Sequence, residues 1–451
     1  MDIFAYRDGL VRDYRDYVES FLAIKDDRVR EYVLEELRKG ALWTNPLIQL
    51  NPNFKPGAWI DDLVAEGLLH DTCAKVFRKG KTVEQRDLQG QPFRLHRHQE
   101  DAIRAAARNQ SYVLTTGTGS GKSLAYIIPI VNHVMRHGSG KGIQAIVVYP
   151  MNALANSQFG ELEKFLKAGF PEGQEPITFK RYTGQENNQE RDAIMANPPD
   201  ILLTNYVMLE LILTRPQERR SLIKAAQGLK FLVLDELHTY RGRQGSDVAL
   251  LLRRVRETLK SESMLMVGTS ATMGGGRTYA ERQARVAEVA TRIFGTPVAP
   301  ESVIGETLQR ATVDATFLPD AVAPVLRDRV ADPAFEIPRS FEGFRQDPLS
   351  AWIERTFGVR PEVGSDRLER AQPLTLEQAG KVLGELTGCE PLDCQIAIRR
   401  WLLHSYTCES NPETGFKPFA FRLHQFISKG DAVYASMEPA ARWTTMPARP
   451  W

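Results

Sequence analysis

Residues 115–123, TTGTGSGKS, have the types and spacing of a loop that binds phosphate. A strand-like apolar run, Tyr112–Leu114, precedes them, and a helix-like apolar run, Leu124–Val134, follows. Backbone N–H groups of such a glycine-rich turn can hold the phosphates of a nucleotide. Lys122 would reach the β- and γ-phosphates, and the Ser123 hydroxyl would hold Mg²⁺. A Gly/Ser-rich linker is the alternative, but the flanking strand and helix count against it.

One position of this loop departs from the general phosphate-loop pattern. Thr116 stands where the first glycine is expected, so the remaining pattern is x-x-x-G-x-G-K-S. We predict that the whole loop contributes to nucleotide binding. The predicted nucleotide-binding residues are Thr116, Gly117, Thr118, Gly119, Ser120, Gly121, Lys122 and Ser123.

A second group of polar residues could activate water for phosphoryl transfer. The run LVLDELH, residues 232–238, is an apolar strand that ends in Asp235 and Glu236. Asp235 would hold the Mg²⁺, and Glu236 would orient or deprotonate the attacking water. Alone, this run is equally typical of a core strand with a polar end. Here it follows the phosphate loop, and Ser270-Ala271-Thr272 follows a further apolar run, so three motifs stand in order at the ends of predicted strands.

These motifs resemble those of the superfamily 2 DExH-box helicases, whose first RecA-like lobe carries a phosphate loop, then DExH, then SAT. The resemblance implies a nucleic-acid-stimulated ATPase with ATP and Mg²⁺ as cofactors. It implies that His238 links the ATP site to the nucleic-acid site and that Ser270 and Thr272 couple the two. Gln99, in LHRHQEDAI, resembles the family's adenine-reading glutamine. A glutamine amide can pair with adenine through two hydrogen bonds.

Three further segments resemble the family's nucleic-acid motifs. Residues 149–158, YPMNALANSQ, have Met151-Asn152 where the family has Thr-Arg, and residues 202–210, LLTNYVMLE, have Asn205 where it has Pro. Thr183-Gly184 is similar to the Thr-Gly motif. The residues predicted to contact nucleic acid are Pro150, Asn152, Thr183, Gly184, Thr204, Arg241 and Arg243.

Arginines follow the DELH strand. Arg241 and Arg243 flank Gly242, where the backbone could approach a phosphate that the arginines hold. The arginines of residues 253–256 fit a phosphate contact and a solvated helix face equally well. None of these arginines stands in a base-reading context, so we expect salt-sensitive, sequence-tolerant binding to the backbone.

Two longer segments are similar to large bacterial helicases of the MrfA type. They are residues 238–255, HTYRGRQGSDVALLLRRV, and residues 421–436, FRLHQFISKGDAVYAS. Some helicases of this broad group belong to phage-defence systems. The resemblance implies 3′ to 5′ movement on DNA, single-stranded or unwinding, with RNA as the other candidate. In the group, the second segment precedes a cysteine-containing region and the second RecA-like lobe.

The second lobe of the family carries a motif near Q-x-x-G-R-x-G-R, and no such string follows Thr272. The basic runs at Arg367–Arg370 and Arg399-Arg400 lack its glycines. An arginine finger contributes on the order of 10³–10⁵ in rate in related sites. We therefore expect the chain to bind ATP but to turn it over poorly unless a separate chain supplies the second lobe. The alternatives are a non-catalytic, ATP-gated nucleic-acid-binding or scaffold subunit, for example in phage defence, and a truncated or split gene product.

The composition is that of a soluble globular protein: 42% of the 451 residues are hydrophobic and 25% are charged. A net charge of +2 means that nucleic-acid binding must come from local arrangement. The sequence shows neither a signal peptide nor a run of about 20 apolar residues, so we expect a cytoplasmic protein with no membrane partner. Cys389, Cys394, Cys408 and His404 lack zinc-site spacing, which favours buried structural cysteines.

The elements that must position these motifs divide the chain into three regions. Residues 91–297 alternate apolar strands and helices, which predicts an α/β fold, a RecA-like P-loop NTPase lobe with a parallel sheet flanked by helices. Residues 1–90 predict a mostly helical accessory domain, acting as a brace or a structural cap, and residues 298–451 an α-rich accessory region with a truncated-looking tail. The predicted strands are Tyr112–Thr115, Ala145–Tyr149, Ile201–Thr204, Phe231–Leu234 and Met264–Thr269.

Overall fold

A computed structural model describes residues 2–426, apart from residues 22, 41–42, 85–87, 118, 262, 272–274, 314–318, 363–364, 366 and 413–414. The chain forms two compact units. The sheet unit comprises Phe54–Leu308 and Glu362–Arg367, and the helical unit comprises the chain up to Asn53, Gln309–Pro361 and the chain from Leu368 onward. Each unit has its own buried core.

The sheet unit is built on seven strands that all run parallel. In spatial order they are β11 (Val303–Gly305), β5 (Tyr112–Thr115), β10 (Leu265–Ser270), β9 (Phe231–Leu234), β6 (Ala145–Tyr149), β8 (Ile201–Asn205) and β7 (Phe179–Tyr182). Strands β5, β10, β9 and β6 are buried at every residue. Burial on both faces is typical of a parallel sheet between helices, so the predicted fold class is confirmed.

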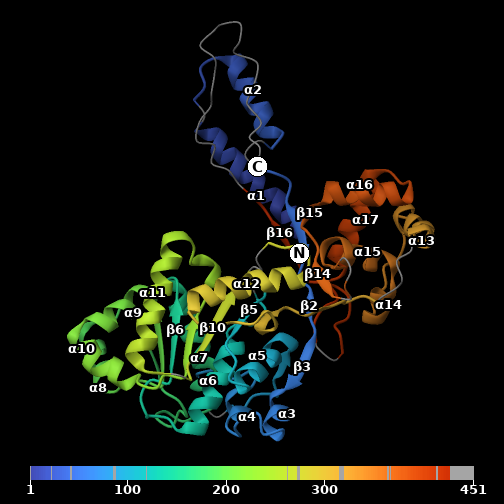
Figure 1. The fold of residues 1–451 in the computed structure, drawn as a ribbon. Helices are drawn as coiled ribbons and strands as arrows, with labels where there is room; N and C mark the ends of the chain where they lie inside the picture. Colours follow the sequence, from blue (N-terminus) through green and yellow to red (C-terminus); the bar gives the residue numbers. More distant parts are fainter. Residues whose placement is uncertain are drawn as a thin grey trace. The chain divides into compact units, whose positions relative to one another are not determined.

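Helices cover both faces of this sheet (Figure 1). Because side chains alternate along a strand, each strand contributes to two cores. Tyr112 and Leu114 of β5 pack in one cluster with helices α3 to α7, whereas Val113 packs in the other with α9, α11 and α12. The helices of this unit are α3 (Ile60–Ala65), α4 (Cys73–Val76), α5 (Arg97–Ala107), α6 (Leu124–His137), α7 (Asn152–Leu166), α8 (Asn188–Ala196), α9 (Tyr206–Thr214), α10 (Pro216–Glu218), α11 (Gly242–Leu259) and α12 (Tyr279–Phe294).

Shorter elements complete the sheet unit. Strands β3 (Pro56–Trp59) and β4 (Arg94–His96) form an antiparallel pair just before α5. A π-helical turn (Arg219–Ile223) and two 3₁₀ turns (Leu237–Thr239 and Pro300–Ser302) connect larger elements. Since both faces of the main sheet are covered, the carboxyl ends of its strands are where polar side chains can gather.

The helical unit contains a three-stranded sheet in which β1 pairs antiparallel with both β15 and β16. The strands of this sheet are β15 (Leu374–Thr375), β1 (Leu47–Leu50) and β16 (Phe421–His424), and β13 (Val359–Pro361) forms a separate antiparallel pair with β14 (Leu368–Arg370). Its helices are α1 (Ile3–Ser20), α2 (Asp27–Arg38), α13 (Pro319–Ala331), α14 (Phe341–Gln346), α15 (Pro348–Phe357), α16 (Leu376–Thr387) and α17 (Pro391–His404). The chain passes between the units at β2 (Asn53–Phe54) and β12 (Leu308–Gln309).

Residues 1–90, predicted as one accessory segment, thus contribute to both units. The pairing of β1 with β16 joins positions that are far apart in the chain, which local sequence patterns do not show. None of the helices in the described part of the chain has the length and apolar content that a membrane span requires.

Two leucines of α11 allow a matched test of the packing on this sheet. Leu252 is 1% exposed, whereas Leu250, two positions away, is 59% exposed. We expect Leu252→Ala to lower the free energy of unfolding by about 2–5 kcal/mol through lost burial and a cavity. Leu250→Ala should change it by about 0.5 kcal/mol or less. Denaturant unfolding followed by circular dichroism measures both, and equal losses would contradict the packing described here.

Candidate functional site

The predicted site residues gather at the carboxyl edge of the sheet. The phosphate loop follows β5, Ser270 ends β10, and Asp235 and Glu236 follow β9. These three strands are neighbours in the sheet. The strand order therefore brings the phosphate loop next to two motifs that lie more than a hundred residues later in the chain. Thr118 and Thr272 lie outside the described residues.

Two side chains of α5 contact backbone carbonyl groups of the phosphate loop. His98 Nε2 lies 3.0 Å from the carbonyl oxygen of Ser120, and Gln99 Nε2 donates to the carbonyl of Gly121 at 2.9 Å. Both side chains are buried. The Gln99 oxygen in turn accepts from the backbone N–H of His96 at 2.8 Å. Two consecutive peptide groups of the loop are thereby fixed in orientation.

The conformation of the loop also depends on its own glycines and on a hydrogen bond within it. Gly119 and Gly121 have φ values of +80° and +69°, in the left-handed region that favours glycine. A Cβ atom on Gly121 would lie 2.5 Å from Gln99 Nε2, so the glycine is needed for this contact. The Thr116 hydroxyl lies 2.6 Å from that of Ser120, across the loop. The side chain of Thr116, where the general pattern has glycine, therefore has a partner within the loop.

Lys122 of the loop lies next to Glu236, the second acid of the DELH motif. Lys122 Nζ lies 3.4 Å from Glu236 Oε1. Glu236 has a φ of +51°, which is unusual for a residue other than glycine and marks a backbone held by its surroundings. Its N–H donates to the Thr269 hydroxyl at 3.0 Å, and that hydroxyl donates to Asp235 Oδ1 at 2.5 Å. Burial of Asp235 raises the pKa of its carboxyl group.

His238 continues this polar cluster toward β10. Its Nδ1 lies 3.2 Å from Glu236 Oε2 and 3.3 Å from the Ser270 hydroxyl. A continuous set of polar contacts therefore runs from Lys122 through Glu236 and His238 to Ser270. The residues predicted to couple the two sites are in contact, apart from Thr272, which lies outside the described residues.

The donor atoms at this site suit magnesium. Ser123 and Asp235 offer oxygen atoms, which Mg²⁺ prefers, and Mg²⁺ is usually held by one or two carboxylates together with phosphates and water. Among the described residues, no group of three or more His, Cys, Asp or Glu side chains could hold a metal by itself. Cys394 and Cys408 are buried in the core of the helical unit.

Five of the residues predicted to contact nucleic acid lie along the next three strands of the sheet. Asn152 follows β6, Asn205 ends β8 and Thr183 follows β7. The Asn205 amide donates to Asn152 Oδ1 at 2.7 Å and to the Thr183 carbonyl at 3.0 Å, so it joins all three strand ends. Its oxygen accepts from the N–H of Met208 and caps α9. The asparagine that replaces the family's proline thus has a structural role.

Several of these residues are already bound within the protein. The Thr204 hydroxyl is buried and donates to the carbonyl of Tyr182 at 2.7 Å. The N–H groups of Thr183 and Gly184 donate to the Glu186 carboxylate at 2.8 and 2.9 Å. Pro150 and Asn152 are half-buried, and Gly184 is exposed. A phosphate could reach the Thr183 and Gly184 amides only in place of Glu186.

The arginines after the DELH motif divide into two groups. Arg241 and Arg243 are exposed, and Arg241 Nε donates to the His238 carbonyl at 2.8 Å. In contrast, Arg253 and Arg256 donate to the carbonyls of Arg292 and Gly295 at the end of α12, at 3.2 and 2.9 Å. Arg253 and Arg256 therefore stabilise the packing of α11 on α12.

Sequence comparison agrees with this geometry. Residues 96–280 match the model of the DEAD/DEAH box helicase family. Residues 96–280 form a DEAD/DEAH box helicase domain. This domain contains every predicted ATP-site residue, and the predicted family resemblance is confirmed.

Curated relatives of this chain are longer proteins. Druantia protein DruE of Escherichia coli is 24% identical over 63% of this chain and 21% of its own length. The uncharacterized ATP-dependent helicase YprA of Bacillus subtilis is 28% identical over 42% of this chain and 24% of its own length. The chain thus spans about a fifth to a quarter of the length of these relatives. A solved structure of the DUF1998 helicase MrfA bound to DNA and AMPPNP is 22% identical, covers 60% of this chain and 33% of its own, and gives a TM-score of 0.43.

The buried histidine of the DEAD/DEAH domain predicts a pH dependence of stability. Burial lowers the pKa of His98 from 6.5 to about 4. Between these values the unfolded chain binds a proton that the folded chain does not, so stability falls as the pH falls. We expect wild type to lose about 2 kcal/mol more than His98→Gln between pH 7 and pH 5. Glutamine can still donate to Ser120 but does not titrate. Identical losses in denaturant unfolding would show that His98 is not held neutral.

Proposed function

We propose that the sheet unit is the ATP-binding lobe of a nucleic-acid helicase or translocase, in which ATP hydrolysis drives movement along DNA. One observation carries the proposal: Lys122 Nζ of the phosphate loop lies 3.4 Å from Glu236 Oε1, the acid that would position water. The DEAD/DEAH domain and the ATP-dependent helicases among the relatives support the same function.

Each residue of the ATP site would have a distinct role. The loop N–H groups and Lys122 would bind the phosphates of ATP, and Ser123 and Asp235 would hold Mg²⁺. Bound Mg²⁺ would neutralise charge that develops on the phosphates. Glu236 would orient the attacking water and accept its proton, because its left-handed backbone and the contact with Lys122 fix its carboxylate.

Nucleic acid would lie along the ends of β6, β8 and β7, next to the ATP site. His238 and Ser270 would transmit the nucleotide state to this face through their contact. Resemblance to the MrfA-type helicases favours 3′ to 5′ movement. Efficient turnover would need the arginines of a second RecA-like lobe, on a longer form of this protein or on a separate chain.

Two substitutions separate ATP binding from hydrolysis. Lys122→Ala removes the charged phosphate contact and should weaken Mg·ATP binding about 10- to 100-fold. Glu236→Gln should keep Mg·ATP binding but lose hydrolysis, since the amide cannot accept the proton. The measurements are a fluorescence titration with labelled ATP and a phosphate-release assay with and without single-stranded DNA.

The two assays also distinguish the rival function, a non-catalytic ATP-gated binding subunit. Tight ATP binding and DNA binding by wild type, with no hydrolysis even when a second lobe is added, would favour the rival. Hydrolysis retained by Glu236→Gln would contradict the proposed role of this acid.

The exposed arginine after the DELH motif offers a test of the nucleic-acid face. If Arg243 contacts one phosphate, Arg243→Ala should lower the salt-dependence slope of single-stranded DNA binding by about 0.7. The effect should be the same for different DNA sequences, because a phosphate contact carries no base information. Arg220→Ala removes the same charge from an exposed position outside the predicted contacts and serves as the control. Equal slopes for the two variants would place the DNA elsewhere.

A further inference from the structure

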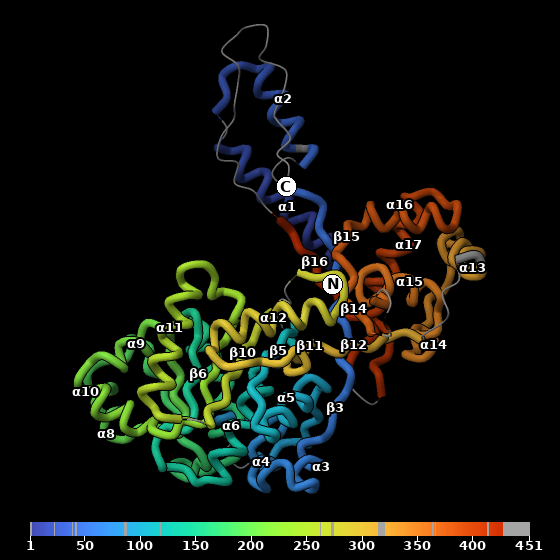
Figure 2. The backbone as a smooth tube through the Cα atoms, in the orientation of Figure 1, coloured from blue at the N-terminus to red at the C-terminus, as the bar shows by residue number. Residues whose placement is uncertain are grey.

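A carboxylate approaches the phosphate loop from the edge of the sheet. Strand β11 pairs parallel with β5, with Gly305 opposite Thr115, the first residue of the loop segment. Figure 2 shows β11 beside β5. Glu306 is the next residue after β11, so it lies level with the start of the loop. Its Oε2 atom accepts a hydrogen bond from the backbone N–H of Gly117 at 3.2 Å.

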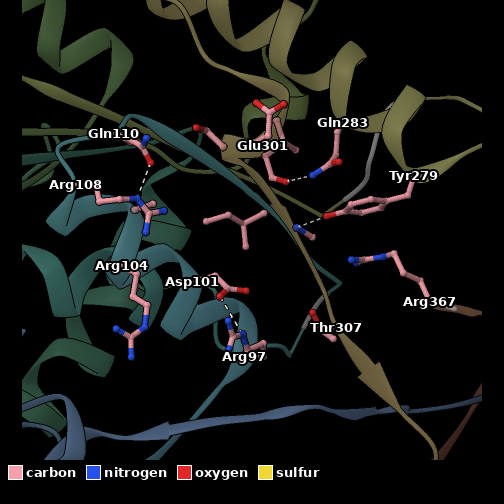
Figure 3. A pocket seen from close by; sticks show the side chains of 15 residues that line it. Arg97, Asp101, Arg104, Arg108, Gln110, Tyr279, Gln283, Glu301, Thr307 and Arg367 are labelled. Carbon is pink, nitrogen blue, oxygen red and sulfur yellow. Dashed lines mark hydrogen bonds and ion pairs between the residues drawn. The ribbon is translucent and has the colours of Figure 1, made fainter. Parts of the chain in front are cut away.

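The main chain at Glu306 is fixed by two neighbouring side chains. Arg367 Nη2 donates to the Glu306 carbonyl at 3.0 Å, and the Tyr279 hydroxyl accepts from the N–H of Gly305 at 3.0 Å. The Arg367 guanidinium also lies over the Tyr279 ring, 3.7 Å from its centroid. Figure 3 shows Arg367 and Tyr279 on one side of a cavity of about 370 Å³. These contacts fix the main chain at Glu306, from which its carboxylate reaches the N–H of Gly117.

An acid at this position has two opposing effects. Its hydrogen bond to Gly117 orders the first turn of the loop, which favours any ligand that needs the loop preformed. Its negative charge, however, lies beside a loop whose function is to attract the phosphates of a nucleotide. Like charges at short range repel, more strongly at a half-buried site than in bulk water.

We propose that Glu306 is a positioning residue that orders the phosphate loop while its charge limits the affinity of the loop for nucleotide. The inference rests on the proposed ATP-binding function. Its consequence is faster release of nucleotide than the loop alone would allow. Arg367, which the sequence places in a basic run without the glycines of an arginine-finger motif, contributes by holding the Glu306 main chain.

Two substitutions of Glu306 separate the effect of its hydrogen bond to Gly117 from the effect of its charge. Glutamine keeps an oxygen that can accept from Gly117 but has no charge, so Glu306→Gln in the full chain should bind Mg·ADP about three- to tenfold more tightly than wild type. The gain should shrink between 50 mM and 300 mM salt, because screening weakens the repulsion. Glu306→Ala loses both the charge and the bond, so it should bind Mg·ADP more weakly than Glu306→Gln. Glu301→Gln removes an exposed acid just before β11 and should leave the affinity unchanged.

The probe is fluorescent ADP, and Lys122→Ala reports on the proposed function itself. Equal affinities of wild type and Glu306→Gln, or a difference that does not respond to salt, would overturn the role of Glu306 and leave ATP binding in place. A wild-type chain that binds ADP no better than Lys122→Ala would overturn the proposed function and this inference together.

Discussion

The N–H groups of a phosphate loop face the ligand, so its buried carbonyl groups need partners on the other side of the loop. In this protein those partners come from the first turn of α5, where His98 and Gln99 bind the carbonyls of Ser120 and Gly121. The contact depends in turn on the packing of α5, whose Ala102 and Ile103 are buried in the same core as Tyr112 of β5. The geometry of the loop is therefore set by the hydrophobic core beneath it.

The order of the strands in the sheet determines which functional residues lie next to one another. The ends of β5, β10 and β9 carry the loop, Ser270 and the two acids, and the ends of β6, β8 and β7 carry five of the predicted nucleic-acid residues. Because β9 and β6 are neighbours, the two groups adjoin without any further element between them. Asn205 ties the outer three strand ends together. The backbone N–H of Asp235 donates to the carbonyl of Val148 in β6 at 2.9 Å, so the main chain joins the two groups.

Buried strands could be predicted from the sequence and edge strands could not. The apolar runs Ala145–Tyr149 and Phe231–Leu234 coincide with β6 and β9, since strands covered on both faces must be apolar throughout. The edge strand β7 was not predicted because its sequence, FKRY, has polar residues at its centre. The other edge, β11, has only three residues. With β11 unseen, nothing in the sequence pointed to Glu306.

The site residues that sequence reasoning missed share one property: each acts on another residue and not on a ligand. Thr269 orients Asp235 and Glu236, and His98 orients the loop, roles that depend on contacts between distant segments. Gln99 was predicted as an adenine contact, and that remains a prediction. Its amide already donates to Gly121 and accepts from His96, and its Nε2 atom lies 3.5 Å from the Ser120 carbonyl oxygen. An amide has two donors and two acceptor sites, so adenine would have to use the second of each. Reading the base and holding the loop would then fall to one side chain, and the shape of the loop would respond to the base that is bound.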